Sequence, residues 1–232
     1  MNVGNYKGNP NIKENFPADI PPEQNCSFWL SGLPGNTDYK SLLAALRGTG
    51  SVYQCHLTPP QEGRHLTSAA KVIFFDLAVA QHFWARFGLY SPTRRPLVIG
   101  GNIIKVERNR TAVEEPRRKW PLGQEYSRVL RVTSRAVRGT VNAEEILKKV
   151  KEKSGNTLYF ELEGYYPVIN GAMDILFSSF RAQAHTAWVI LKRHQTEMGI
   201  FVKFARDPCT PLDLSTWIDK VEVPVGKGSP HC

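Results

Sequence analysis

The sequence predicts an α+β protein made of two copies of one small unit, each with the element order strand, helix, strand, strand, helix, strand. Two observations carry this prediction. Short apolar runs bounded by turn residues indicate strands, whereas apolar residues at helical spacing indicate the helices between them. The same order occurs over residues 25–110 and again over residues 127–209 of the 232-residue chain. The 41% hydrophobic content is sufficient for two domain cores.

The first unit begins with the stretch Asn25–Pro34, an aromatic strand that a Ser-Gly-Leu-Pro sequence ends abruptly. The other expected elements are a helix capped by Thr37 or Asp38, strands at Ser51–Leu57 and Ala69–Phe75, a helix from Asp76 towards Phe87, and a hairpin over Pro96–Arg108. This order is that of ferredoxin-like βαββαβ folds. We therefore expect two ferredoxin-like domains, each a four-stranded antiparallel sheet backed by two helices.

Trp29 is the candidate binding residue of the first strand. Successive strand residues point to opposite faces, so Phe28 and Leu30 share the core face and Trp29 takes the open face. A large ring is costly to expose without a use. The sequence therefore predicts a contact for Trp29 outside the core.

These residues resemble those of the RNA recognition motif (RRM), a four-stranded sheet that binds single-stranded RNA. The short signature of that family is matched by Phe28-Trp29-Leu30-Ser31-Gly32-Leu33, and the spacing of Phe74 and Ala80 matches the longer one. The resemblance places the two usual stacking positions of the third strand at Ala69 and Lys71. This copy thus keeps one stacking ring of the usual three.

The resemblance implies a binding surface for single-stranded RNA on the first sheet. We expect Trp29 to stack on a base, with lysines beside it for phosphate and polar residues of the second strand for base edges. Three residues at the end of the fourth strand are expected to line the exit. The candidate RNA-binding residues are Trp29, Gln54, His56, Lys71, Lys105, Arg108, Asn109 and Arg110.

The second unit resembles a more diverged RRM, and the pair is similar to the tandem-motif proteins of filamentous fungi. Its expected elements are strands at Arg128–Thr133, Leu158–Glu163, Met173–Ser178 and Ile200–Ala205, a helix starting near Asn142, a loop at Gly164–Pro167, and a helix over Phe180–Arg193. Acidic residues in the first turn of the Asn142 helix and lysines in its last turn complement the helix dipole.

The second sheet is predicted to be a poor RNA surface. Arg131 takes the first-strand aromatic position, and the two third-strand positions fall on Ala172 and Asp174. None of these offers a ring, and an Asp repels phosphate. We therefore expect this domain to be structural or protein-binding, its sheet partly covered by a short helix at Pro211–Lys220.

The net positive charge lies on the two domains, and three further segments flank or join them. Residues 25–110 carry ten Lys and Arg against four Asp and Glu, a net +6, and residues 127–209 carry thirteen against eight, a net +5. The positive charge thus lies on the domains, which favours a folded basic surface for an acidic partner. We expect a flexible leader at 1–24, a linker at 111–126 and a C-terminal segment at 210–232.

Several function classes find no support in the sequence. It contains no Gly-rich phosphate loop, no G-x-S-x-G and no H-E-x-x-H, so we expect no enzyme, no catalytic residues and no cofactor. The four cysteines are scattered, which predicts no metal site, and Cys26 and Cys55 are expected to be buried. No apolar run is long enough to span a bilayer. We expect an intracellular protein, nuclear or cytoplasmic with the nucleus favoured.

Two readings of function remain open. In the first, the protein binds single-stranded RNA mainly through the first sheet. In the second, the RRM-like domains form a protein-interaction scaffold that no longer binds RNA, with a partner at the second domain or the linker. The missing aromatics at Ala69 and Lys71 favour the scaffold, and the positive charge of the first domain favours RNA.

Overall fold

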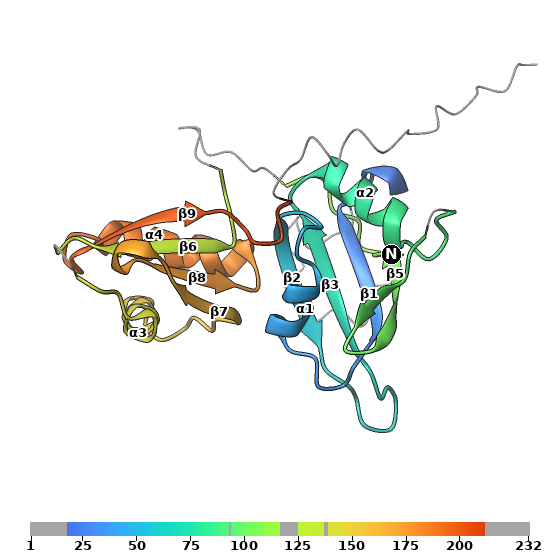
Figure 1. The fold of residues 1–232 in the computed structure, drawn as a ribbon, viewed down its shortest axis with the longest axis horizontal. Helices are drawn as coiled ribbons and strands as arrows, with labels where there is room; N and C mark the ends of the chain where they lie inside the picture. Colours follow the sequence, from blue (N-terminus) through green and yellow to red (C-terminus); the bar gives the residue numbers. More distant parts are fainter. Residues whose placement is uncertain (1–17, 93, 117–124, 137–138, 212–232) are drawn as a thin grey trace, which may run out of the picture.

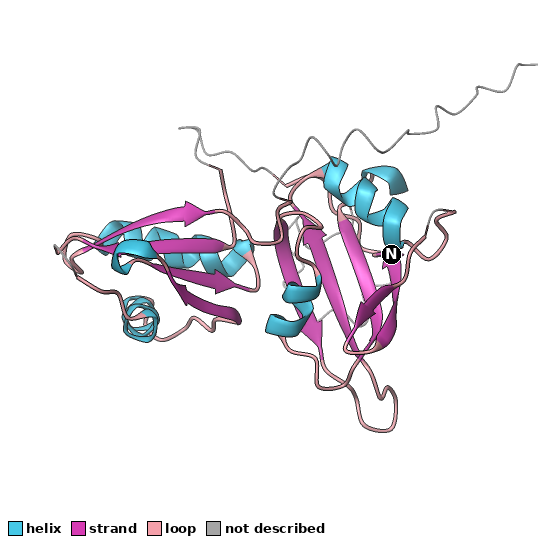
Figure 2. Cartoon of the chain, in the orientation of Figure 1, coloured by secondary structure: helices cyan, strands magenta, loops and turns pink. Residues whose placement is uncertain are grey.

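The computed structural model describes residues 18–92, 94–116, 125–136 and 139–211, which form two α+β domains lying side by side (Figure 1). The first domain contains β1 (Ser27–Leu33), α1 (Tyr39–Ala45), β2 (Val52–Thr58), β3 (Ser68–Phe74), α2 (Leu77–Phe87), β4 (Leu97–Ile99) and β5 (Asn102–Arg108), preceded by the short turn η2 (Pro22–Gln24). In both domains the strands gather in one sheet and the helices pack against it (Figure 2). The predicted ferredoxin-like fold class is confirmed.

The first sheet has the strand order β2-β3-β1-β5-β4. The hairpin expected at Pro96–Arg108 forms two strands, so this sheet has five strands where four were expected. Its turn uses Gly100 and Gly101, with φ of +56° and +85°. Two successive positive φ angles are the requirement of a tight hairpin turn, and glycine meets it without steric cost.

The core of the first domain lies between the sheet and its helices. Phe28 and Leu30 are fully buried there, as the strand alternation predicts. Asp38 is the cap of α1, because its side chain accepts a hydrogen bond from Ser41 N at 2.7 Å. Cys26 and Cys55 are both buried, which confirms their reading as small core residues. Burial raises the pKa of the Cys55 thiol to about 12.

The second domain repeats the order of the first. It contains β6 (Val129–Ser134), α3 (Ala143–Lys153), β7 (Leu162–Pro167), η3 (Ile169–Gly171), β8 (Met173–Phe177), η4 (Phe180–Ala184), α4 (His185–His194) and β9 (Ile200–Ala205). Its four-stranded sheet has the order β7-β8-β6-β9. Asn142 caps α3 by accepting from Glu144 N at 2.9 Å.

One strand of the second domain differs from the expectation. The sequence reading placed a strand at Leu158–Glu163 and a loop at Gly164–Pro167, whereas β7 covers Leu162–Pro167. Tyr165 and Tyr166 pair with β8, and a bulge interrupts the ladder between Leu162 and Gly164. The Gly and the Pro at either end of the tyrosine pair suggest a turn, but here they occupy a bulge and the end of an edge strand, where both are tolerated.

The second helix of this domain also begins later than expected. Regular helix starts at His185, not at Phe180, because Arg181 is extended (φ −62°, ψ 133°) and Ala182 has a φ of +61°. A positive φ is unfavourable for a residue with a Cβ. The segment η4 is therefore an irregular turn that surrounding contacts hold in place.

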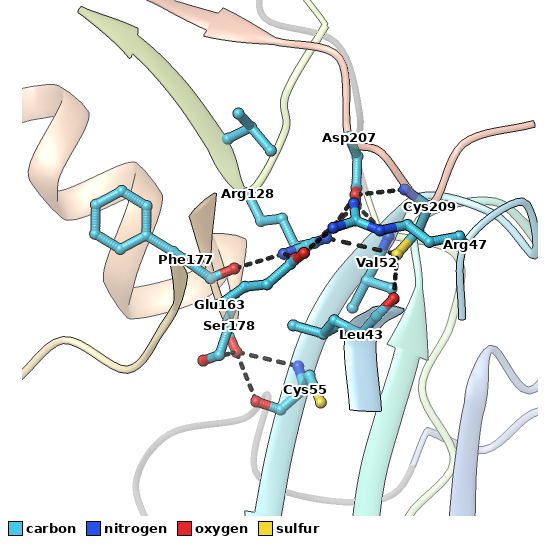
Figure 3. Close-up of polar contacts among 12 residues, drawn as sticks. Leu43, Arg47, Val52, Cys55, Arg128, Glu163, Phe177, Ser178, Asp207 and Cys209 are labelled. Carbon is cyan, nitrogen blue, oxygen red and sulfur yellow. Dashed lines mark hydrogen bonds and ion pairs between the residues drawn. The ribbon is translucent and has the colours of Figure 1, made fainter. Parts of the chain in front are cut away.

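A buried arginine, Arg128, lies where the two domains meet (Figure 3). Its guanidinium donates to the two carboxylate oxygens of Asp207 at 2.9 and 2.8 Å and pairs with Glu163 at 2.7 Å. Arg47, which follows α1, binds the same Glu163 from the first domain. Burial alone would lower the pKa of Arg128, but the charges of Asp207 and Glu163 raise it above its ordinary value. The network therefore holds charges of both domains in one buried cluster.

The outer edge of β2 is closed by the second domain. Val52 N donates to Asp207 Oδ2 at 2.9 Å. Further along the strand, Ser179 Oγ accepts from Cys55 N at 3.1 Å and donates to Cys55 O at 3.0 Å. Unpaired strand edges invite pairing with other chains, so these contacts protect the edge as well as joining the domains.

An aromatic cluster continues the junction. Phe180 lies with its ring centroid 5.8 Å from Tyr53, 5.4 Å from Phe75 and 4.7 Å from Tyr126. Tyr53 and Phe75 belong to the first domain, yet Phe75 is buried in the core of the second. The two domains therefore share part of one hydrophobic core.

This cluster predicts a pH dependence of stability. Burial lowers the pKa of His185, which contacts Phe180, below its ordinary value of 6.5. Below about pH 6.5 the unfolded chain therefore binds a proton that the folded chain resists, and stability falls as the pH decreases through this window. We expect a lower Tm at pH 5 than at pH 7, with part of the difference removed by His185→Phe. Equal differences in the wild type and in His185→Phe would contradict this; His65→Phe, in an exposed loop, is the matched control.

Some expectations lie outside the described residues. They include residues 1–17 of the expected leader, residues 117–124 of the expected linker and all but the first residue of the Pro211–Lys220 helix. The coverage of the second sheet by that helix thus stays a prediction.

Candidate nucleic-acid interface

Four side chains form a row across the open face of the first sheet. His56 of β2 pairs with Lys71 of β3, Lys71 pairs with Trp29 of β1, and Trp29 pairs with Glu107 of β5. Directly opposed residues in antiparallel strands have Cβ atoms about 5 Å apart, so neighbours in the row are within contact. Trp29 is half-buried and His56 is exposed. The structure thus brings three of the predicted site residues, Trp29, His56 and Lys71, into one line.

Lys71 lies at the middle of this face, between His56 and Trp29. It is half-buried, and burial lowers the pKa of its ammonium group from the ordinary value. The positive charge of Arg181, from the second domain, lowers it further.

A second row lies one step along the strands. It consists of Thr58, Ala69, Ser31 and Lys105. Lys105 Nζ forms an ion pair with Glu107 Oε1 at 3.0 Å, so this lysine is already partly neutralised. Gln54 lies on the other side of the first row, opposite Ile73, and is half-buried.

Arg108 lies on the other side of the sheet from Trp29. Its guanidinium carbon is 5.0 Å from the Trp84 ring and 5.8 Å from the Phe28 ring, and Phe28 belongs to the core. Nη1 also donates to Asn25 O at 3.1 Å. Arg108 therefore packs on the helical side, and the expectation that it lines the exit of the open face does not fit this position.

Asn109 and Arg110 follow β5 and differ in their surroundings. Asn109 Nδ2 donates to Ser27 Oγ at 3.1 Å, and its Oδ1 accepts from Thr111 N at 3.3 Å. Its amide therefore ties β5 to the start of β1. Arg110 is exposed.

Three residues of this face are not among the predicted RNA-binding residues. Glu107 places a carboxylate directly beside Trp29. Ile103 of β5 and Val98 of β4 are paired and are 65% and 52% exposed. Strand alternation from Lys105 identifies Ile103 and Glu107 as residues of the same face, so the signal was present.

The row at the same position of the second sheet is internally paired. Arg131 of β6 donates from Nε and Nη2 to the two carboxylate oxygens of Asp174, both at 2.7 Å. Lys203 of β9 lies on the other side of Arg131. Asp174 is therefore the ion-pair partner of Arg131. The sequence had predicted an unpaired negative charge at this position.

Two rings on this sheet were also missed. Tyr166 of β7 pairs with Asp174 in the same row and is 41% exposed. Phe201 of β9 is 54% exposed, and the Arg135 guanidinium lies 4.3 Å from its centroid. Tyr166 was not identified because Gly164–Pro167 was predicted to be a loop, and strand alternation assigns no sheet face to a loop residue.

The described residues contain no group of three His, Cys, Asp or Glu side chains that could hold a metal ion. No helix in these ranges is long and apolar enough to cross a membrane.

The fold is that of two ferredoxin-like α+β domains in tandem. No family model and no curated protein matches the chain. Among solved structures, it is similar to the RNA recognition domains 1 and 2 of Sex-lethal from Drosophila melanogaster, at 13% identity and a TM-score of 0.28 over 78% of this chain and 100% of that chain. It is also similar to the first two RRM domains of the yeast poly(U)-binding protein Pub1, at 11% identity and a TM-score of 0.25 over 78% and 99% of the two chains. A third similar structure is the RNA-binding domain of Hrp1 in complex with RNA, at 12% identity and a TM-score of 0.29 over 79% and 98%.

Proposed function

We propose that this chain is a non-enzymatic protein that binds single-stranded RNA, mainly through the open face of the first sheet. The observation that carries the proposal is the row of His56, Lys71 and Trp29 across β2, β3 and β1. It combines a flat ring, a cation and a group able to bond to a base edge. Stacking of one base on an aromatic side chain contributes about 1–3 kcal/mol. Electrostatic attraction to phosphate adds to this in a sequence-independent way.

The set of residues proposed to contact RNA is narrower than the sequence set. Trp29, His56 and Lys71 form the centre, and Gln54 and Lys105 lie one step away along the strands. Arg110, exposed after β5, remains a candidate for phosphate. Arg108 and Asn109 are left out, because their side chains hold other parts of the domain together.

The second domain is proposed to be mainly structural. Its Arg131 and Asp174 neutralise each other, and its contacts close the edge of β2. We further propose that the protein is intracellular and acts in the nucleus or the cytoplasm, with the nucleus favoured.

A protein-interaction surface is the alternative, and one observation favours it. Glu107 lies beside Trp29 and pairs with Lys105, which weakens the attraction of this side for phosphate. Next to it are the exposed apolar residues Ile103 and Val98. A peptide with an apolar anchor would fit this part of the face better than RNA would.

Trp29→Ala tests the proposal. We expect the affinity for single-stranded homopolymeric RNA to fall about tenfold or more, because one stacked base is lost. Fluorescence anisotropy with the full chain measures this, and thermal melts establish that the fold is kept. Trp29→Phe retains a ring and should lose much less.

The matched control is Tyr166→Ala, which removes an exposed ring from the second sheet. RNA affinity should stay near that of the wild type if the first sheet is the main surface. Wild-type chain that binds no homopolymer at low salt would refute RNA binding and favour the protein scaffold. Equal losses in Trp29→Ala and Tyr166→Ala would contradict the assignment to the first sheet.

A further inference from the structure

Large rings lie exposed on the two edge strands of the second sheet. Tyr166 of β7 is 41% exposed, and Phe201 of β9 is 54% exposed. Neither ring belongs to the core cluster of this domain. Exposed aromatic surface of this kind commonly marks a place that a partner covers. The structural role of the second domain at the junction does not account for these two rings.

Cross-strand pairing fixes the position of each ring on one face of the sheet. Phe201 pairs with Thr133, on the face opposite the core residue Val132. The neighbouring row crosses all four strands and consists of Tyr166, Asp174, Arg131 and Lys203. The two rings therefore lie at opposite ends of adjacent rows, on the same open face.

The half of this face nearest the domain junction is closed. Val129 and Leu176 pair with each other one row closer to the junction, on the same face, and both are buried. At that end of the sheet, α1 of the first domain lies against β7. The rows that contain Arg131 and Thr133 form the outer half of the face, and both exposed rings lie there.

The outer half of the face has a positive charge beside one of its rings. Arg131 and Asp174 neutralise each other through two hydrogen bonds of 2.7 Å. Lys203 is exposed, and the ion pairs between described residues do not include it. Arg135 is exposed as well, with its guanidinium carbon 4.3 Å from the Phe201 ring centroid. The two cations therefore lie on the Phe201 side of the face, where they suit an acidic group next to an apolar one.

The spacing of the two rings favours a peptide over RNA. Their strands, β7 and β9, are separated by β8 and β6. Because neighbouring strands lie about 4.8 Å apart, the rings are on strands about 14 Å apart. Residues i and i+4 of an extended peptide point to the same side and are about 13 Å apart. The two central strands, where a stacked base would need a ring, carry Asp174 and Arg131.

We propose that the outer half of the second sheet docks an extended acidic peptide of a partner protein. Two apolar or aromatic side chains of the peptide, four positions apart, cover Tyr166 and Phe201. An Asp or Glu beside the second of them pairs with Lys203 and Arg135. This docking site goes beyond RNA binding by the first sheet and does not depend on it.

Selection from a random peptide library against the full chain tests this docking site. We expect the enriched peptides to carry apolar or aromatic residues at positions i and i+4, with Asp or Glu next to one of them. In anisotropy titrations with these peptides, Tyr166→Ala and Phe201→Ala should each lower the affinity about fivefold to thirtyfold, as the loss of an anchor residue does. Lys203→Glu should lower it more at low salt than at high salt, because salt screens exposed charges.

The matched controls change an exposed ring and an exposed lysine elsewhere in the same domain. They are Tyr159→Ala, which removes a ring that is 78% exposed, and Lys192→Glu on α4. Both variants should bind the enriched peptides as the wild type does. Thermal melts of all the variants establish that the fold is kept.

Three other outcomes would overturn the docking site. The first is no enrichment over background, or enriched peptides that bind Tyr166→Ala and Phe201→Ala as tightly as the wild type. The second is enriched peptides that reproduce residues 212–218, which would assign the face to the chain's own C-terminal segment. The third is a loss of homopolymeric RNA affinity in Phe201→Ala, which would assign the face to RNA. A wild type that binds no RNA refutes only the function proposed above, because peptide binding is measured without RNA.

Discussion

Replacing Arg128 by methionine is expected to lower the free energy of unfolding by about 3–5 kcal/mol, the usual cost of removing one partner from a buried ion pair. The side chains of Arg128 and Glu163 are fully buried, and that of Asp207 is 1% exposed. Methionine fills a similar volume but leaves Asp207 without its main counter-charge and the carbonyl of Phe177 without its donor at 2.9 Å. Among the described residues, Glu163 then keeps Arg47 as its ionic partner.

Denaturant titration at pH 7 measures this loss, and Arg131→Met is the matched control. Arg131 also binds a carboxylate through two hydrogen bonds, but its side chain is 34% exposed. Exposed pairs contribute at most about 1 kcal/mol, so the two variants should differ severalfold in their effect. Similar losses in the two variants would mean that the Arg128 network does not hold the domains together.

The order of elements could be predicted from the sequence because it depends on local patterns. Strand alternation placed Phe28 in the core, and the polar residues before the first helix predicted a cap at Thr37 or Asp38, of which Asp38 is the cap. Two predicted element boundaries are wrong, because tertiary contacts override the local preference at these positions. The Gly-Tyr-Tyr-Pro sequence forms the end of an edge strand, and the helix expected from Phe180 starts at His185.

The domain junction could not be predicted, because its residues have no local signal. Arg128 looks like any charged residue before a strand, and its partner Asp207 lies 79 positions away. Only the folded chain shows that Glu163, Asp207 and Arg47 converge on one buried point. A count of net charge does not distinguish such buried charges from charges on the surface.

The candidate site was predicted in part. Trp29 and Lys71 followed from alternation and from the family resemblance, and the structure places them side by side. Arg108 illustrates a correctable error: it is three positions from Lys105 on one strand, so the two must point to opposite faces.

Phe180→Ala is expected to lower the free energy of unfolding by about 3–5 kcal/mol, as for other large-to-small changes of a buried phenylalanine. Phe180 is 7% exposed and contacts rings from both domains, including Tyr53 and Phe75 of the first. The cavity therefore opens at the junction, and both domains should lose stability. Phe201→Ala removes a ring that is 54% exposed in the same domain and should cost much less.

Hydrogen exchange shows whether the junction makes the domains one cooperative unit. In Phe180→Ala, amides of β2 such as Val52 and Cys55 should exchange faster, although they lie in the other domain, because their partners Asp207 and Ser179 are held by the same junction. The amides of β9 should lose protection in parallel. If only the second domain loses protection while β2 is unchanged, the domains unfold independently. Parallel loss in β2 and β9 means that the stability of the first sheet, and with it the row containing Trp29, depends on the packing of Phe180.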